Sequence, residues 1–161
     1  MSMRKKPWNR VNQPVYSVSS KGAEGFNMNI CTYVTPVSMK PKRYLLGIYE
    51  NTQTLANLEL NKQFVLQILQ DNQYNLIRML GQRSGKSVDK IMLLDKRKLV
   101  VDWEGYPVLK DCLAVLKLKA IREFDGGDHR CFLCDVVSYK NTNEGKALDL
   151  DLLKKKKLIR S

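Results

Sequence analysis

The most restrictive feature of the sequence is a pair of long strand-like segments joined by a tight turn. Residues 112–124 and 131–139 are rich in aliphatic and aromatic side chains, and residues 125–128 (DGGD) have the composition of a hairpin turn. Strands joined by so short a turn pair antiparallel. The hairpin therefore predicts a mainly β fold with an antiparallel sheet, which we expect to close as a barrel.

Four more strand-like segments precede this hairpin. Strands are predicted over residues 14–20, 26–34, 43–50 and 63–70. The first alternates apolar and small polar residues, as a half-buried strand does. The second is expected to stop near Pro36, because proline cannot donate to a ladder. The third contains Gly47, which indicates a bulge or the close approach of another backbone.

Two helices are predicted among these strands. The first is capped by Thr52 or Thr54, whose hydroxyl can accept a hydrogen bond from the first turn, and it ends near Asn61. The second covers residues 73–82, with Gly81 as its C-terminal stop. Strands thus outnumber helices, and we expect the helices to be peripheral.

The composition fits one folded domain with an anionic partner. The 161 residues include 43% hydrophobic and 27% charged side chains, which excludes disorder for the bulk of the chain, and the net charge is +12. We divide the chain into a basic leader (1–10), one domain (11–147) and a basic tail (148–161). Residues 4–6 and 154–157 supply seven positive charges. Such clusters either bind phosphate chains or keep a protein soluble.

The sequence lacks the long apolar segments of membrane-spanning or secreted chains. The longest apolar run, residues 112–116, is far shorter than the roughly 20 residues of a membrane span. No apolar stretch follows the basic start, so no signal peptide is expected. Four cysteines without a signal peptide are expected to be reduced thiols, which predicts a cytoplasmic location.

Residues 81–87 (GQRSGKS) resemble a P-loop but fail its requirements. Three residues rather than four separate the glycines, and the segment follows a predicted helix instead of a strand. Nucleoside triphosphate hydrolysis is therefore not expected. The segment remains either a turn whose Arg83, Ser84 and Lys86 donate to a phosphate or a solvated basic loop.

Cysteine and histidine do not form a metal or redox site. Cys131 and Cys134 have the spacing of a redox pair, but on a strand residues three apart point to opposite faces. With a single histidine, His129, structural zinc and other metal sites are not expected. His129 follows the Gly-Gly-Asp turn, where it is either an ordinary turn residue or a ligand contact at the mouth of a barrel.

The order of these signals resembles the flavin reductase-like family, whose fold is the FMN-binding split barrel. The resemblance covers roughly residues 11 to 140 and implies a mainly β, antiparallel Greek-key split β-barrel with a few peripheral helices. The matching stretches are 26–34 (beginning FNMN), 37–38, Pro41, 52–57 (TQTLAN), 63–66, 84–86 with 89–90, and 127–129.

The resemblance implies a homodimer that holds FMN at or near the subunit interface. It places His129 over the flavin near the nicotinamide, as the catalytic candidate. The implied cofactor-binding residues are Asn29, Ile30, Cys31, Thr32 and Thr35 along one strand, Tyr49, Glu50, Asn51 and Thr54 at the start of the first helix, and Ser84 and Lys86 in the phosphate-side turn.

The implied function is an NAD(P)H-dependent flavin reductase. The sequence contains no Gly-x-Gly-x-x-Gly motif, so a separate Rossmann domain is not expected and the nicotinamide would stack directly on the flavin. The flavin supplies the hydride chemistry, and the protein would orient it and place donors at its edge.

The sequence also departs from the family pattern. Members often have two prolines where this chain has Pro41-Lys42, and a polar residue in place of Cys31; the basic tail after Leu153 has no counterpart. Two other functions remain open: an FMN-binding electron carrier without nicotinamide turnover, and a basic nucleic-acid-binding barrel. The second is disfavoured because the predicted strands carry few stacking aromatics and the positive charge concentrates at the termini.

Overall fold

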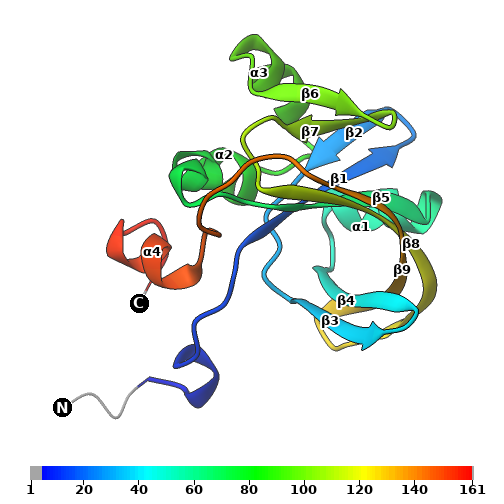
Figure 1. Ribbon diagram of the computed structural model, residues 1–161, viewed down its shortest axis with the longest axis horizontal. Coiled ribbons are helices and arrows are strands. Elements are labelled where there is room, and N and C mark those ends of the chain that lie inside the picture. Colours follow the sequence, from blue (N-terminus) through cyan, green and yellow to red (C-terminus); the bar gives the residue numbers. More distant parts are fainter. Residues whose placement is uncertain (1–4, 161) are drawn as a thin grey trace.

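The computed structural model describes residues 5–160, so Arg4 of the basic leader lies outside the described residues. Figure 1 shows a curled sheet with helices around it. The strands are β1 (Tyr16–Gly22), β2 (Gly25–Met28), β3 (Val34–Met39), β4 (Lys42–Tyr49), β5 (Gln63–Ile68), β6 (Val100–Trp103), β7 (Tyr106–Leu109), β8 (Ala114–Asp125) and β9 (His129–Asn141). The helices are α1 (Gln53–Leu60), α2 (Ile77–Gln82), α3 (Lys90–Lys96) and α4 (Leu150–Lys155), with 3-10 segments η1 (Pro7–Asn9) and η2 (Asp71–Leu76).

Seven strands form one antiparallel sheet in the order β2-β1-β5-β8-β9-β4-β3, and β6 and β7 form a separate hairpin. The long β8–β9 hairpin confirms the prediction from residues 112–139. The mainly β, antiparallel fold with few helices is likewise confirmed. Within residues 5–160, however, no ladder joins the edge strands β2 and β3 into a closed barrel. A bridge from Tyr16 to Cys31 ties their connecting segment to β1 instead.

The expectation of a half-buried first strand is wrong, because β1 is covered on both faces. All residues from Val15 to Ser20 are buried. Tyr16 and Val18 belong to the core inside the curl of the sheet, whereas Val15 belongs to a second core. The serines leave room for close neighbours: Ser20 Oγ accepts a hydrogen bond from Asn57 Nδ2 of α1 at 3.0 Å.

The second predicted strand is broken in two. β2 ends at Met28, and β3 continues past Pro36 to Met39 instead of stopping near the proline. Proline is tolerated there because β3 is an edge strand and its register shifts between Pro36 and Ser38. The irregular residues 29–33 between the two strands are thereby free to line a cavity.

The helix signals are confirmed at α1 and partly wrong at α2. Thr52 caps α1, which ends at Leu60 with Asn61 as its C-cap, in agreement with the predicted end near Asn61. The expected helix 73–82 is the 3-10 segment η2 followed by α2. Gly81 lies inside α2 rather than after it, and its missing side chain is explained by packing: a Cβ would stand 3.2 Å from Ile30 Cγ1.

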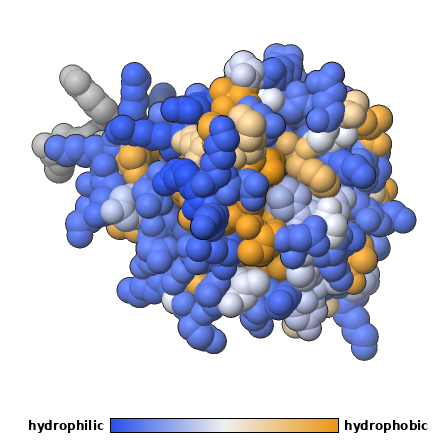
Figure 2. Space-filling view, turned by 90° about the horizontal axis from the view of Figure 1, so that it is seen from above, coloured by the Kyte–Doolittle hydropathy of each residue, from blue (hydrophilic) through white to orange (hydrophobic). Residues whose placement is uncertain are grey.

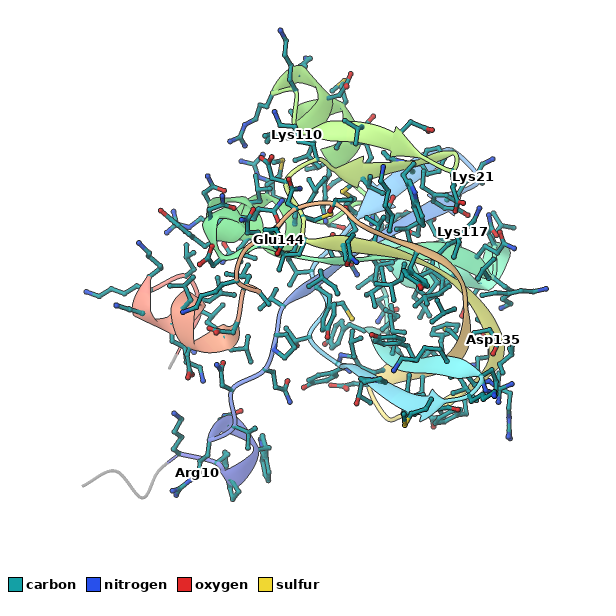
Figure 3. All side chains as sticks on the ribbon, viewed as in Figure 1. Arg10, Lys21, Lys110, Lys117, Asp135 and Glu144 are labelled. Atoms are coloured by element: carbon teal, nitrogen blue, oxygen red, sulfur yellow. The ribbon has the colours of Figure 1, made fainter. Side chains whose placement is uncertain are left out.

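Three elements were not anticipated from the sequence: α3, the β6–β7 hairpin and α4. α4 lies in the basic segment 148–161, begins at the cap Asp149 and buries Leu153. Arg10, at the other end of the chain, lies on a segment that extends away from the sheet (Figure 3). Within residues 5–160 no helix is long and apolar enough to cross a bilayer.

Candidate functional site

A cavity of about 600 Å³ lies between three segments: the irregular residues after β2, the start of α1, and the end of α2 with the turn that follows it. We call it the strand–helix cavity. Its volume lies in the range of roughly 300–1,000 Å³ that small-molecule sites occupy. It is lined by Asn27, residues 29–33, 47–54 and 80–85, Lys90 and His129.

The tight turn from β4 into α1 forms one wall of this cavity. Asn51 has a left-handed backbone with φ of 61°, a conformation that asparagine tolerates better than most residues. The Thr52 hydroxyl donates to Tyr49 O at 2.8 Å and accepts from Leu55 N at 3.2 Å. A helix start exposes amide groups that have no partner inside the helix, and these carry a partial positive charge. The wall therefore offers fixed donors to an anion.

The turn at residues 84–86 fits closely against β2, next to a hydrogen bond between β2 and α1. Asn27 Nδ2 donates to Thr54 Oγ1 at 3.1 Å, and both side chains are buried. A Cβ at Gly85 would collide with the Asn27 side chain. The turn thus reaches this position because residue 85 has no side chain, and the Asn27–Thr54 pair fixes the distance between β2 and α1.

His129 lies between two tyrosines at the rim of the cavity. Its ring centroid is 4.6 Å from that of Tyr33 and 5.1 Å from that of Tyr49. His129 Nδ1 is 2.6 Å from Asp128 Oδ1. Because a carboxylate accepts hydrogen bonds, this contact favours a proton on Nδ1. In the neutral ring, Nε2 is then an acceptor.

Gly47 allows this aromatic group to assemble. Gly47 N donates to Tyr33 O at 2.8 Å, and a Cβ at residue 47 would stand 3.3 Å from Tyr33 Cβ. Of the two alternatives predicted for Gly47, a bulge or the close approach of another backbone, the structure shows the second.

Lys90 is a buried cation in the wall of the cavity; it lies in the matching stretch 89–90 but was not among the predicted site residues. It is 4% exposed, and its Nζ donates to Met28 O at 3.0 Å and to Leu80 O at 2.8 Å. Burial lowers its pKa to about 8. The sequence did contain a signal for this burial. Lys90 precedes the buried Leu94 by four residues, so both lie on the apolar face of α3.

The cysteines are free. Cys31 lines the cavity, and its Sγ contacts Gly47 O at 3.7 Å. Burial raises the pKa of Cys31 to about 12, which keeps it a thiol. Cys134 is fully buried whereas Cys131 is half-buried, consistent with opposite faces of β9. Among residues 5–160, no three His, Cys, Asp or Glu side chains form a group that could hold a metal ion.

The structure brings the site candidates together with two exceptions. Thr35 is exposed on β3 and lines a shallow pocket beside Tyr33 and His129. Lys86 lines a neighbouring cavity of about 1010 Å³, which we call the hairpin cavity. The candidates that line the strand–helix cavity are Asn29, Ile30, Cys31, Thr32, Tyr49, Glu50, Asn51, Thr54, Ser84 and His129.

The hairpin cavity lies between the β1–β2 turn, α3 and the β6–β7 hairpin. Met92 and Val101, each about half exposed, contribute apolar surface to it. Figure 2 looks down on the end of the molecule that carries α3 and this hairpin, and shows hydrophobic side chains gathered between hydrophilic ones. The two cavities share Asn27, Gln53 and Gly85.

Sequence comparison connects this arrangement to known proteins. The chain is 26% identical over 143 residues to a Rhizobium rhizogenes protein named FMN reductase (NADH) RutF 2, covering 86% of this chain and 78% of that protein. It is 22% identical over 121 residues to a diflavin flavoprotein of Nostoc sp.. That match covers 74% of this chain but spans 21% of the length of the Nostoc protein.

Structural comparison gives the same fold. The NADH:FAD oxidoreductase SgcE6 of Streptomyces globisporus superimposes with a TM-score of 0.78 at 20% identity, covering 92% of this chain and 93% of that chain. Residues 8–155 match the family model described as "Flavin reductase like domain". Because that match takes in the sheet, α1 to α4 and the whole strand–helix cavity, the chain belongs to the family of flavin reductase like domains.

Proposed function

We propose that this protein binds FMN in the strand–helix cavity and reduces flavin with NADH or NADPH. The observation that carries the proposal is the convergence, on one cavity, of the expected residues other than Thr35 and Lys86. These come from four separate parts of the chain. Family membership and the relative named FMN reductase (NADH) support the same function.

The residues of the cavity fit a phosphorylated flavin. An FMN phosphate is an anion, and the start of α1, Arg83 and Lys90 offer amide donors and positive charge. The ring is flat and largely apolar with a polar edge, which suits Ile30 beside Asn29 and Thr32. When bound, the flavin would supply the hydride-accepting chemistry.

The aromatic rim gives the chain its own part in catalysis. Tyr33 and Tyr49 flank the His129 ring, and Asp128 Oδ1 contacts its Nδ1. His129 would then position a nicotinamide at the mouth of the cavity, with Nε2 available to accept a hydrogen bond. Such positioning contributes to the rate by reducing the entropy lost on reaction.

The proposal includes a homodimer whose interface covers the rim. Tyr33 and Tyr49 are 58% and 55% exposed although they belong to the site, and Trp8 on the extended N-terminal segment is 72% exposed. Large exposed aromatic side chains are typical of protein contacts. Light scattering should give a dimer that Tyr33→Glu weakens; a monomer at micromolar concentration would contradict this part.

Free cysteines support the expected cytoplasmic location.

An absorbance scan of the purified protein tests the flavin. We expect the two visible bands of bound FMN after reconstitution, and release of the ligand on denaturation. Steady-state oxidation of NADH and NADPH in the presence of FMN then tests the reductase. Protein that shows no flavin spectrum after incubation with excess FMN would contradict the proposal.

A second candidate is an FMN-binding electron carrier without nicotinamide turnover. It is favoured by the match to one fifth of a diflavin flavoprotein and by the fold shared with an FMN-binding protein of Thermus thermophilus. The two candidates separate on one measurement: the carrier would bind FMN and exchange electrons with a chemical reductant, but it would oxidise neither nicotinamide.

A further inference from the structure

The lysine run that follows Leu153 is folded against the protein. α4 ends in a Schellman motif, in which Lys157 N donates to Lys154 O at 3.0 Å and Leu158 N donates to Leu153 O at 2.9 Å. Lys157 has the left-handed backbone of this motif, with φ of 57°. Leu153 is buried, and Leu158 packs against the same core. The fold therefore sets where each lysine of the run lies.

This turn sends the basic side chains to two places. Lys156 Nζ lies 4.6 Å from the centre of the Tyr74 ring, which is a cation–π contact. An open pocket of about 700 Å³, which we call the tail pocket, takes the others: it is lined by Lys154, Lys157 and Arg160 together with Gln82, Leu158 and Ile159. No Asp or Glu is among these described lining residues. Three positive charges therefore face one pocket.

The charges of the tail pocket are available to a ligand. None of the four ion pairs within residues 5–160 includes Lys154, Lys157 or Arg160. The acidic residues of α4 stand at its opposite end, where Asp149 accepts from Leu152 N at 2.9 Å. Lysine binds phosphate as a point charge and arginine binds it through a two-pronged contact, so this set of side chains suits phosphate groups.

The tail pocket adjoins the strand–helix cavity through Gln82. This residue lines both, and its Nε2 donates to Leu158 O at 3.4 Å, which ties the tail to the end of α2. Figure 1 shows α4 next to α2 at one side of the sheet. The next residue, Arg83, lines the strand–helix cavity and is one of the groups that would meet the flavin phosphate there. A ligand longer than FMN would therefore meet the tail pocket.

We propose that the tail pocket binds the adenosine-phosphate half of a dinucleotide whose other half occupies the strand–helix cavity. The inference rests on the proposed function for the ligand of that cavity. FAD and the nicotinamide dinucleotides each consist of a mononucleotide joined to adenosine monophosphate, so both carry the group that the tail pocket recognises. The consequence is that the protein binds a dinucleotide more tightly than the matching mononucleotide, and that the tail sets this difference.

Lys157→Gly tests the pocket while preserving the fold. Glycine is favoured at a left-handed helix end, so the thermal stability should be unchanged or higher. We expect the Kd of FAD to rise about fivefold, as for an exposed charge pair, while the Kd of FMN stays within about twofold. Calorimetry on the FMN-loaded protein then compares oxidised NAD with nicotinamide mononucleotide. A selective loss for NAD would assign the pocket to the nicotinamide substrate, and a selective loss for FAD to the flavin.

Lys98→Gly is the matched control. Lys98 ends α3 in the same motif, with φ of 57° and a hydrogen bond from its N to Asp95 O at 2.8 Å. It lines neither the tail pocket nor the strand–helix cavity. The control removes the same charge and relaxes the same backbone conformation, so it should leave all four dissociation constants within about twofold of wild type.

Three results would overturn the inference and leave the proposed function standing. The first is a Lys157→Gly variant with unchanged affinity for both dinucleotides. The second is an equal loss in Lys98→Gly, which would make the effect one of net charge. The third is a loss in Lys157→Gly of affinity for a single-stranded oligonucleotide without any change in the dinucleotide preferences, which would make the pocket a nucleic-acid contact. Failure of the wild-type protein to bind FMN would instead overturn the proposed function itself.

Discussion

The strand–helix cavity and the hairpin cavity share a wall but are lined by different chemistry. The hairpin cavity is the larger, at about 1010 Å³ against 600 Å³. Its lining includes one lysine, Lys86, and four carboxylates, Glu24, Asp89, Asp95 and Asp102. The strand–helix cavity carries Glu50 against Arg83 and Lys90, beside the start of α1.

Under the proposed function, this difference favours the smaller cavity over the larger one as the site of the anionic ligand. Carboxylates around the hairpin cavity disfavour a phosphate, whereas amide groups and a buried cation favour one in the smaller cavity. The shared wall, formed by Asn27, Gln53 and Gly85, is therefore the place where the assignment can be tested most directly.

The largest effect on FMN affinity is expected from a larger side chain in the shared wall. Gly85→Val places side-chain atoms where Asn27 lies and breaks its hydrogen bond to Thr54, which narrows the strand–helix cavity. We expect FMN affinity to fall by about a hundredfold or more, equivalent to about 3 kcal/mol of binding free energy, because the displaced side chains occupy space in the cavity. Fluorescence titration of FMN measures this.

Gly105→Val is the matched control in the hairpin cavity. Gly105 has φ of 85°, and a Cβ at this position would have no neighbouring atom within 4 Å, so the substitution strains the turn without filling space near Asn27. Its thermal stability should fall while FMN affinity stays within about twofold of wild type. The opposite pattern, with FMN binding lost in Gly105→Val alone, would reverse the assignment of the two cavities.

His129→Ala tests whether the rim acts in turnover rather than in flavin binding. We expect kcat/KM for NADH to fall by about tenfold to a hundredfold, with FMN affinity changed by less than about threefold, because the ring lies at the mouth of the cavity. Stopped-flow reduction of bound FMN separates the two quantities. Asp125→Asn in the same turn serves as the control, and equal losses of FMN binding and rate would argue against the role.

The buried charge of Lys90 predicts a pH dependence of stability. Its pKa is about 8 in the folded chain and 10.5 when exposed, so the unfolded state binds more protons between these values and stability rises with pH. Relative to Lys90→Met, the free energy of unfolding of the wild type should increase by about 2 kcal/mol from pH 7.5 to pH 9.5. Urea titrations at the two pH values check this, and a difference that does not change with pH would mean that Lys90 is solvated.

The smallest effect is expected at Lys86. Lys86→Ala should weaken FMN by about threefold and riboflavin less, because an exposed lysine that lines the neighbouring cavity acts on a phosphate only through solvent. Equilibrium dialysis with both ligands distinguishes the outcomes. Equal losses for FMN and riboflavin would remove Lys86 from phosphate binding, whereas a loss above about thirtyfold would place the phosphate in the hairpin cavity.

Local sequence signals predicted two elements that carry site residues, the start of α1 and the hairpin whose turn ends at His129. The apolar segments 112–124 and 131–139 and the DGGD turn between them indicated the β8–β9 hairpin, and the two candidate caps, Thr52 and Thr54, marked the start of α1. Hairpin turns and helix caps depend on neighbours within a few residues, so they can be predicted from a local sequence pattern. The order of such signals also sufficed to propose the family to which the chain belongs.

Other features of the site depend on residues that are distant in sequence. The pattern of Ser17 and Ser19 is that of a half-exposed strand, yet both are buried. Lysine is a residue type that usually lies at the surface. Lys90 is buried because α3 packs against β2 and α2. Position 85 requires glycine because the Asn27 side chain, from a residue 58 positions earlier in the sequence, occupies the space of a Cβ.

Local patterns along the chain were enough to predict the antiparallel sheet, the cap of α1 and the main hairpin, and the family resemblance supplied the candidate residues for a flavin site. Only the folded chain shows that Lys86 and Thr35 lie apart from the other candidates, that His129 stands between two tyrosines, and that a lysine is buried in the cavity wall. Turns and caps are formed by adjacent residues, whereas desolvation and close packing arise where several distant segments meet.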